Sequence, residues 1–175
     1  VAPTPEDPFP AWWSDQMEQD EDGNWWPPDE VIEMVKEHDQ EYFETYTEYL
    51  VETKPPDIKG FIDVLPKFVT GEQLQIELGY MDNLLAGEST VDACEFEFTL
   101  QQPRQFSQDG LQCTLAFFSK NGTCRELDPA TGEEIGSEYV EHSGLTKVRM
   151  LYDTKDGRWK MISFMDYIPP EEIDE

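Results

Sequence analysis

Few side chains in this sequence could carry out acid–base, nucleophilic or metal chemistry. The chain of 175 residues has two histidines, His38 within an expected helix and His142 in an expected turn. A histidine on the apolar side of a helix is more often a hydrogen-bonded core residue than a base. The sequence contains no nucleophile elbow, no His-Glu-x-x-His motif and no phosphate-binding loop. We therefore expect no catalytic constellation and no cofactor.

One acidic stretch, residues 20–24, resembles the start of a calcium-binding loop. Such a loop needs glycine at its sixth position and glutamate at its twelfth. Trp25 and Val31 stand at those positions, so the sequence excludes an EF-hand. No metal site is expected.

The cysteines Cys94, Cys113 and Cys124 are not spaced as metal ligands. Cys94 and Cys113 lie on the apolar faces of expected strands, where a buried thiol is the usual state. Residues 121–123 (Asn-Gly-Thr) match a glycosylation sequon, but Asn-Gly is also a strong hairpin signal. We favour the turn.

Four polar residues would be pocket candidates if the protein were an enzyme: Tyr42, Tyr46, Asp166 and Tyr167. An aspartate surrounded by aromatic rings can have a raised pKa and act as a general base. In such positions, however, tyrosine and aspartate more often have structural roles.

The net charge of −27 makes binding to nucleic acids or to anionic membranes unfavourable. The charge is unevenly distributed, because residues 1–53 hold 16 acidic and one basic side chain and residues 161–175 hold five acidic and no basic ones. The final expected hairpin is locally basic, with Lys147, Arg149, Lys155, Arg158 and Lys160. We expect this hairpin to bind an acidic surface of its own chain or of a second copy. We expect the acidic surfaces of the chain to bind a basic partner.

The elements that would position these residues begin with an extended arm, residues 1–28. The arm holds six prolines, which argue against helix or central strand. It also holds two tryptophan pairs, Trp12-Trp13 and Trp25-Trp26. These side chains are expected either to anchor a partner protein or to cover the core of their own chain.

Three helices are expected next, over residues 29–53, 58–68 and 71–86. Pro27-Pro28 begins the first, and Thr70 with Gln73 forms an expected capping box for the third. The first helix carries an apolar stripe and a glutamate stripe. The glutamate stripe is expected to be either a solvated face or a partner-binding surface. The residues of that partner-binding surface would be Glu37, Glu41, Glu44 and Glu48.

After Gly87 the hydrophobic period changes to two, which predicts strands. They are expected over residues 94–100, 111–118, 123–127, 134–141, 146–153 and 158–168. Helices followed by strands indicate an α+β fold, with an antiparallel sheet covered on one face. We expect one domain over residues 29–168 and an acidic tail over 169–175.

The last hairpin, residues 147–164, has an acidic-Gly turn followed by Gly157-Arg158-Trp159-Lys160. In this it resembles the nuclear-transport-factor-2-like superfamily. The resemblance implies a cone, in which a long helix and shorter helices lie in the concave face of a curved sheet. Its members include isomerases, dehydratases, ligand carriers and non-catalytic assembly domains, so the fold does not determine the activity. Related carbonic anhydrases carry histidines after this tryptophan, whereas residues 164–167 here contain none.

The sequence favours a non-catalytic interaction protein, such as a scaffold or peripheral subunit of a larger complex in an organelle or on a photosynthetic membrane. Its partners would be protein subunits with basic surfaces or a second copy of the chain. No stretch is apolar and long enough to cross a membrane, so membrane contact is expected only through a partner. A start at Val1 is expected either for a processed protein of an organelle, such as a plastid, or of the secretory route, or for a sequence that covers only part of a longer protein. The alternative is a small-molecule-binding cone with isomerase-like, dehydratase-like or carrier activity.

Overall fold

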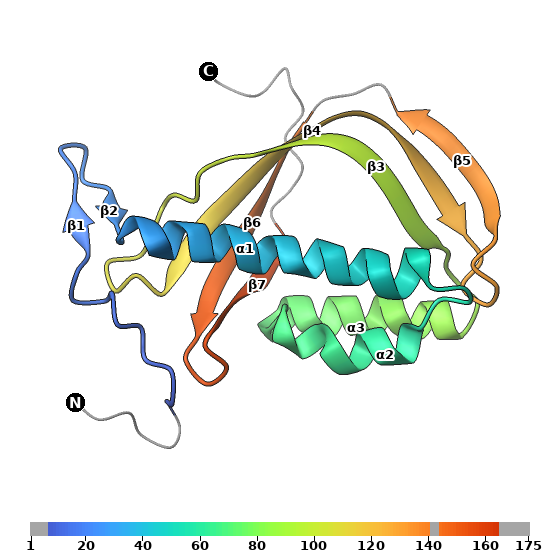
Figure 1. Cartoon of the computed structure of the whole chain (residues 1–175), viewed down its shortest axis with the longest axis horizontal. Helices are drawn as coiled ribbons and strands as arrows, with labels where there is room; N and C mark the ends of the chain where they lie inside the picture. Colours follow the sequence, from blue (N-terminus) through green and yellow to red (C-terminus); the bar gives the residue numbers. More distant parts are fainter. Residues whose placement is uncertain (1–6, 141–143, 165–175) are drawn as a thin grey trace.

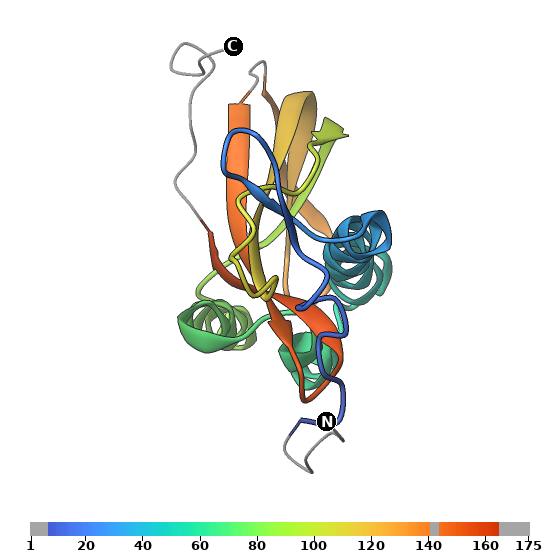
Figure 2. The ribbon, with the colours of Figure 1, turned by 90° about the vertical axis from the view of Figure 1, so that its left-hand side faces the viewer.

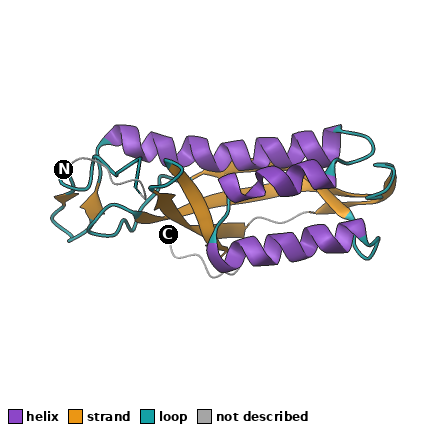
Figure 3. Ribbon diagram, turned by 90° about the horizontal axis from the view of Figure 1, so that it is seen from below, coloured by secondary structure: helices purple, strands orange, loops and turns teal. Residues whose placement is uncertain are grey.

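A curved antiparallel sheet lies over three helices that all cover the same face of it (Figures 1 and 3). This arrangement confirms the expected α+β class. The computed structural model describes residues 7–140 and 144–164. The expected turn at His142, the tail at 169–175, Asp166 and Tyr167 lie outside the described residues.

The first helix lies on the concave side of the sheet (Figure 1). α1 spans Asp29–Tyr46 and continues as a π-helical stretch, Thr47–Glu52, which confirms the long helix expected over 29–53. Two acidic residues in its first turn complement the positive end of the helix dipole. The remaining helical elements are α2 (Ile58–Val64), a 3₁₀ turn (Leu65–Lys67) and α3 (Gly71–Leu85).

The capping box expected at the start of α3 is wrong. Thr70 is the N-cap residue, but its side chain makes no capping hydrogen bond. The Gln73 amide instead donates to Glu77 Oε1 at 3.2 Å and accepts from the Phe164 backbone N–H at 3.4 Å. A contact between α3 and the last strand therefore replaces the local cap.

The main sheet has five strands, and its order is β3-β4-β6-β7, with β5 also paired to β4. The strands are β3 (Val91–Leu100), β4 (Gln112–Leu127), β5 (Glu134–Val140), β6 (Gly144–Asp153) and β7 (Arg158–Phe164). The expected hairpin turn at residues 154–157 joins β6 to β7. Both α1 and α3 pack against β7, which places that strand above the centre of the helical layer.

The Asn-Gly pair at 121–122 does not form the expected turn. The two strands expected around it are one continuous strand, β4. The register with β3 shifts here, so that Asn121 is an extra residue without a partner on β3. A Cβ atom on Gly122 would lie 2.0 Å from the Glu95 carbonyl oxygen, so only glycine fits where β3 approaches. Up to Ser119 the strand pairs with β6, and from Gly122 onward it pairs with β5.

Two of the cysteines form a bridge across β3 and β4. Cys94 and Cys124 are directly opposite each other in the strand register and are disulfide-bonded. The expectation of a buried thiol is therefore wrong for Cys94, which is exposed. It is confirmed for Cys113, which is buried and free, and burial raises the pKa of its thiol.

The described part of the arm folds back along one end of the sheet (Figure 2). It contains a small hairpin, β1 (Glu18–Gln19) and β2 (Trp25–Trp26), whose turn is held by the Asp20 carboxylate. Trp13 is fully buried, stacks on Trp159 with a centroid distance of 6.0 Å, and donates its indole N–H to the Gly110 carbonyl at 2.9 Å. The arm therefore completes the core of its own domain.

Candidate functional site

A groove with a volume of about 1090 Å³ lies between α1 and the arch of the sheet. We call it the concave groove and define it by Asp39, Tyr42 and Phe43 of α1, Glu77 of α3, Phe98 of β3 and Phe117 of β4. In Figure 1 β3 and the far half of β4 rise away from α1, so the helix does not cover this part of the sheet. The curvature of the sheet thus creates the groove.

Large apolar side chains remain exposed along the groove. Phe98 is 55% exposed, Phe164 42% and Leu100 38%. The period-two pattern of residues 94–100 places Phe98 and Leu100 on the apolar face of their strand. Phe98 packs against Phe43, Phe96 and Phe117 at centroid distances of 6.4, 6.4 and 5.4 Å. A row of exposed apolar groups in one concavity is typical of a binding surface.

Carboxylates greatly outnumber basic groups around the groove. Its acidic lining residues are Asp39, Glu44, Glu48, Glu52, Glu77, Asp92 and Glu95. The basic residue in the lining is Arg125, 3.9 Å from Glu95. The groove is therefore both apolar and strongly negative.

Asp39 is the most deeply placed of these carboxylates, at 5% exposure. Within the described residues it has no hydrogen bond or ion pair. Burial raises the pKa of Asp39 from 3.8 to about 7. Tyr42 lies one helical turn further along α1, and burial also raises the pKa of its phenol. A carboxylate in this setting is energetically unsatisfied when it is ionised.

Glu77 faces the same tyrosine from α3. Its carboxylate accepts hydrogen bonds from the Gln73 amide and from the Tyr42 hydroxyl. Burial raises the pKa of Glu77 and these two hydrogen bonds lower it, with a net increase. Asp39 and Glu77 therefore lie on two helices, and the charges of both help to raise the pKa of the buried Tyr42 phenol.

The structure brings together two of the four pocket candidates expected from the sequence. Tyr42 and Tyr46 line the groove, and the Tyr46 hydroxyl donates to the Asp92 carbonyl at 2.9 Å. Asp166 and Tyr167 lie outside the described residues. Sequence reasoning missed Asp39, although an acidic residue within the spacing of the apolar stripe was a usable signal.

The tryptophans of the arm are less available to a partner than expected. Trp13 is fully buried, which contradicts the expectation that it anchors a partner. It instead covers the core of its own chain, the alternative that the sequence left open. Trp25 and Trp26 are half-buried and pack against the core. Trp12 is 43% exposed and remains accessible.

The basic hairpin is largely satisfied within its own chain. Arg158 forms an ion pair with Glu41 of α1 at 2.6 Å, so the acidic helix of the same chain is its partner. Lys160 is 4% exposed and pairs with Asp153 at 2.9 Å and with Asp156. This burial contradicts a role for Lys160 as a partner contact.

The other expected partner contacts divide into three environments. The Arg149 guanidinium donates to the Gln105 carbonyl and the Thr114 hydroxyl at 3.0 Å each, and Lys147 is half-buried. Glu37 is exposed on α1, away from the groove lining. Glu44 and Glu48 line the concave groove.

His38 is a satisfied structural residue, as the sequence predicts. Its Nδ1 accepts a hydrogen bond from the Trp159 backbone N–H at 3.0 Å. Burial, with a further contribution from the nearby Arg158 guanidinium, lowers the pKa of His38 to about 4. The neutral imidazole thus ties α1 to β7.

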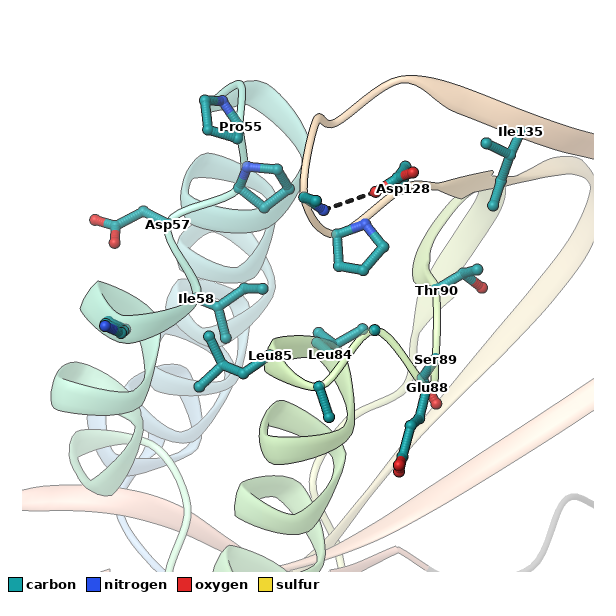
Figure 4. A pocket seen from close by; sticks show the side chains of 16 residues that line it. Pro55, Asp57, Ile58, Leu84, Leu85, Glu88, Ser89, Thr90, Asp128 and Ile135 are labelled. Carbon is teal, nitrogen blue, oxygen red and sulfur yellow. Dashed lines mark hydrogen bonds between the residues drawn. The ribbon is translucent and has the colours of Figure 1, made fainter.

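A second hollow of about 720 Å³ lies at the far end of the molecule (Figure 4). Ile58 and Leu84 face it from α2 and α3, and Ile135 faces it from β5. The Asp128 carboxylate on its rim accepts from the Ala130 backbone N–H at 2.8 Å. This hollow lacks the buried carboxylates of the concave groove.

Over residues 7–140 and 144–164, no three His, Cys, Asp or Glu side chains converge as a metal site. In the same part of the chain, no helix has the length and apolar character needed to cross a membrane.

No protein-family model matches the sequence, and no curated protein sequence matches it. Among solved structures, the fold is similar to the intermembrane space region of the chloroplast protein ARC6, with a TM-score of 0.53. The two share 14% identity over 74% of this chain and 93% of that one. At this identity the similarity supports the fold alone.

Proposed function

We propose that the protein is a non-catalytic interaction module whose concave groove holds a segment of a partner protein. One observation carries this proposal: Phe98, Leu100 and Phe164 are exposed in a groove that is otherwise lined by carboxylates. Apolar side chains that remain uncovered in a concavity gain free energy when a partner removes them from water. The excess of acids specifies a basic partner.

The finer assignment follows from the sequence and from the structural similarity. We propose a scaffold or peripheral subunit of a larger organellar complex, with a plastid as the compartment. The compartment is proposed by analogy with the chloroplast protein whose fold is similar. A second copy of the chain is a less suitable partner for the groove, because it would bring further negative charge. We also propose membership in the nuclear-transport-factor-2-like superfamily, supported by the helices under a curved sheet.

A peptide-display selection on the whole chain tests the docking function. A library of random peptides would be selected on the wild-type protein, and the enriched peptides measured against Phe98→Ser and Leu100→Ser. Both side chains are exposed, so these variants should fold. The expected result is a loss of binding of about tenfold, since each change removes roughly one to two kcal/mol of apolar burial.

The matched control is Ile135→Ser, which alters an equally exposed apolar residue (57%) in the second hollow. This variant should bind the enriched peptides like the wild type. Two results would refute the proposal: a selection that enriches no binding peptide, or peptides that depend on Ile135 and not on Phe98.

A small-molecule function is the second candidate, and Asp39 favours it. The groove is far above the roughly 300 Å³ that a ligand pocket needs. With a pKa of about 7 and Tyr42 one turn away, Asp39 has the properties of a general base. Proton exchange from a bound ketone or thioester that disappears in Asp39→Asn would support this function over docking.

A further inference from the structure

The deepest part of the concave groove has a feature that docking of apolar side chains does not explain. Asp39 is only 5% exposed and lines the groove together with Tyr42 and Phe43 of the same helix. Among the described residues it has neither a hydrogen-bond donor nor a cation. A buried ionised carboxylate without a partner is strongly destabilising. Such a group is retained at a free-energy cost, and a cationic ligand would remove this cost.

A second carboxylate, on another helix, lines the same groove. Glu77 of α3 is hydrogen-bonded to the Tyr42 hydroxyl, and Tyr42 follows Asp39 on α1 by three residues. Residues three apart on a helix lie on the same face, about 5–6 Å apart at Cβ. Both carboxylates therefore lie near enough to the Tyr42 phenol for their charges to raise its pKa.

Aromatic rings line the same groove as these two carboxylates. Tyr42 and Phe43 meet edge-to-face at a centroid distance of 5.2 Å, and Phe43 meets Phe117 of β4 at 5.9 Å. Ring faces attract cations, and a planar guanidinium both stacks on a ring and donates to two carboxylates. An alkali or alkaline-earth ion would need several converging oxygen ligands, which the described residues do not supply here.

We propose that Asp39 and Glu77 form a receptor for one arginine side chain of the docked partner segment, with Tyr42 and Phe43 around its guanidinium. The proposal rests on the docking function and names the chemistry of the partner: an arginine flanked by apolar residues. The apolar flanks would cover Phe98 and Leu100. The chain's own C-terminal stretch, residues 161–175, does not have this chemistry, because it contains five acids and no basic residue.

The test uses two small probes of nearly identical shape, N-acetyl-arginine amide and N-acetyl-citrulline amide, and the whole chain labelled with ¹⁵N. Amide chemical shifts are followed at pH 8 and low salt, where Asp39 is ionised. The arginine probe should shift the resonances of the groove residues saturably, with a dissociation constant about tenfold lower than that of the uncharged citrulline probe. In Asp39→Asn the two probes should bind equally weakly.

Glu37→Gln is the matched control, because it removes the same charge from an exposed position on the same helix. This variant should keep the preference for arginine. Equal binding of the two probes to the wild type would overturn the proposal, as would an unchanged preference in Asp39→Asn or shifts located outside the groove. These outcomes are independent of the peptide selection. The proposal of an arginine receptor can therefore be refuted while the proposed docking function still holds.

Discussion

Replacing Asp39 with asparagine removes a buried charge while keeping the size of the side chain. The carboxylate is 5% exposed and has no cation or hydrogen-bond donor within the described residues. The variant should therefore be more stable than the wild type at a pH at which Asp39 is ionised. Most core substitutions have the opposite effect.

The magnitude follows from the pKa of Asp39. Burial raises this pKa from 3.8 to about 7, a difference of about three units at 1.36 kcal/mol each. Between pH 4 and pH 7 the folded protein retains a proton that the unfolded chain has released, so the contribution of Asp39 to stability falls as the pH rises. Above pH 7 the free energy of unfolding falls no further on account of Asp39, and the total decrease is at most roughly 4 kcal/mol. The neutral amide of the variant carries no such penalty.

Urea denaturation of both proteins at pH 5 and pH 8 measures the difference directly. At pH 8 the variant should exceed the wild type in unfolding free energy by about 2–4 kcal/mol, and at pH 5 the gap should be much smaller. Glu37→Gln, on the same helix and exposed, should show no such pH-dependent gap. A gap between Asp39→Asn and the wild type that is the same at both pH values would refute the reasoning.

Three further changes test other parts of the structure. The pKa of His38 is lowered to about 4, so the stability that this residue provides is lost as the pH falls from 6.5 to 4. In His38→Gln the free energy of unfolding, measured by urea denaturation, should change less over this pH range, by about 1–2 kcal/mol. Changing Cys94 and Cys124 together to serine removes a link between residues separated by 30 positions, and should lower the unfolding free energy by about 3 kcal/mol. A decrease no larger than about 1 kcal/mol would count against the disulfide. Gly110 has φ +73°, and a Cβ atom there would lie 2.8 Å from a ring atom of Trp13. Gly110→Ala should therefore lower the unfolding free energy by about 2 kcal/mol and make the arm sensitive to limited proteolysis. An arm as resistant to proteolysis as in the wild type would contradict the docking of Trp13.

The helical half of the fold was predictable because its signals are local. Pro27-Pro28 and Gly87 mark the ends of the helical region within about two residues, and the period of the apolar residues defines the buried face of α1. His38 was also interpreted correctly, since its surroundings on the helix are apolar.

Errors arose where contacts between distant residues override local patterns. Asn121-Gly122 is a turn signal, but β3 pairs across it and makes it a bulge within β4. Pairing of Cys94 with Cys124 depends on the same register, which a single sequence does not reveal. The concave groove was unpredictable for a related reason: its apolar residues follow the pattern of a core, and only the curvature of the sheet leaves them exposed.

The pairing partner on one edge of β4 changes at Asn121, while β3 stays paired to β4 on both sides of this position. On one side of Asn121 the strand belongs to a half-sheet with β6, and on the other side to a half-sheet with β5. The distal half, Gly122–Leu127, is about 20 Å long at the rise of a β-strand. A rotation of about 10° at the bulge would move its tip by roughly 3.5 Å, nearly the thickness of an aromatic ring. The disulfide of Cys124, three residues beyond the bulge, links this distal half to β3, so that the two strands would move together at the wall of the groove.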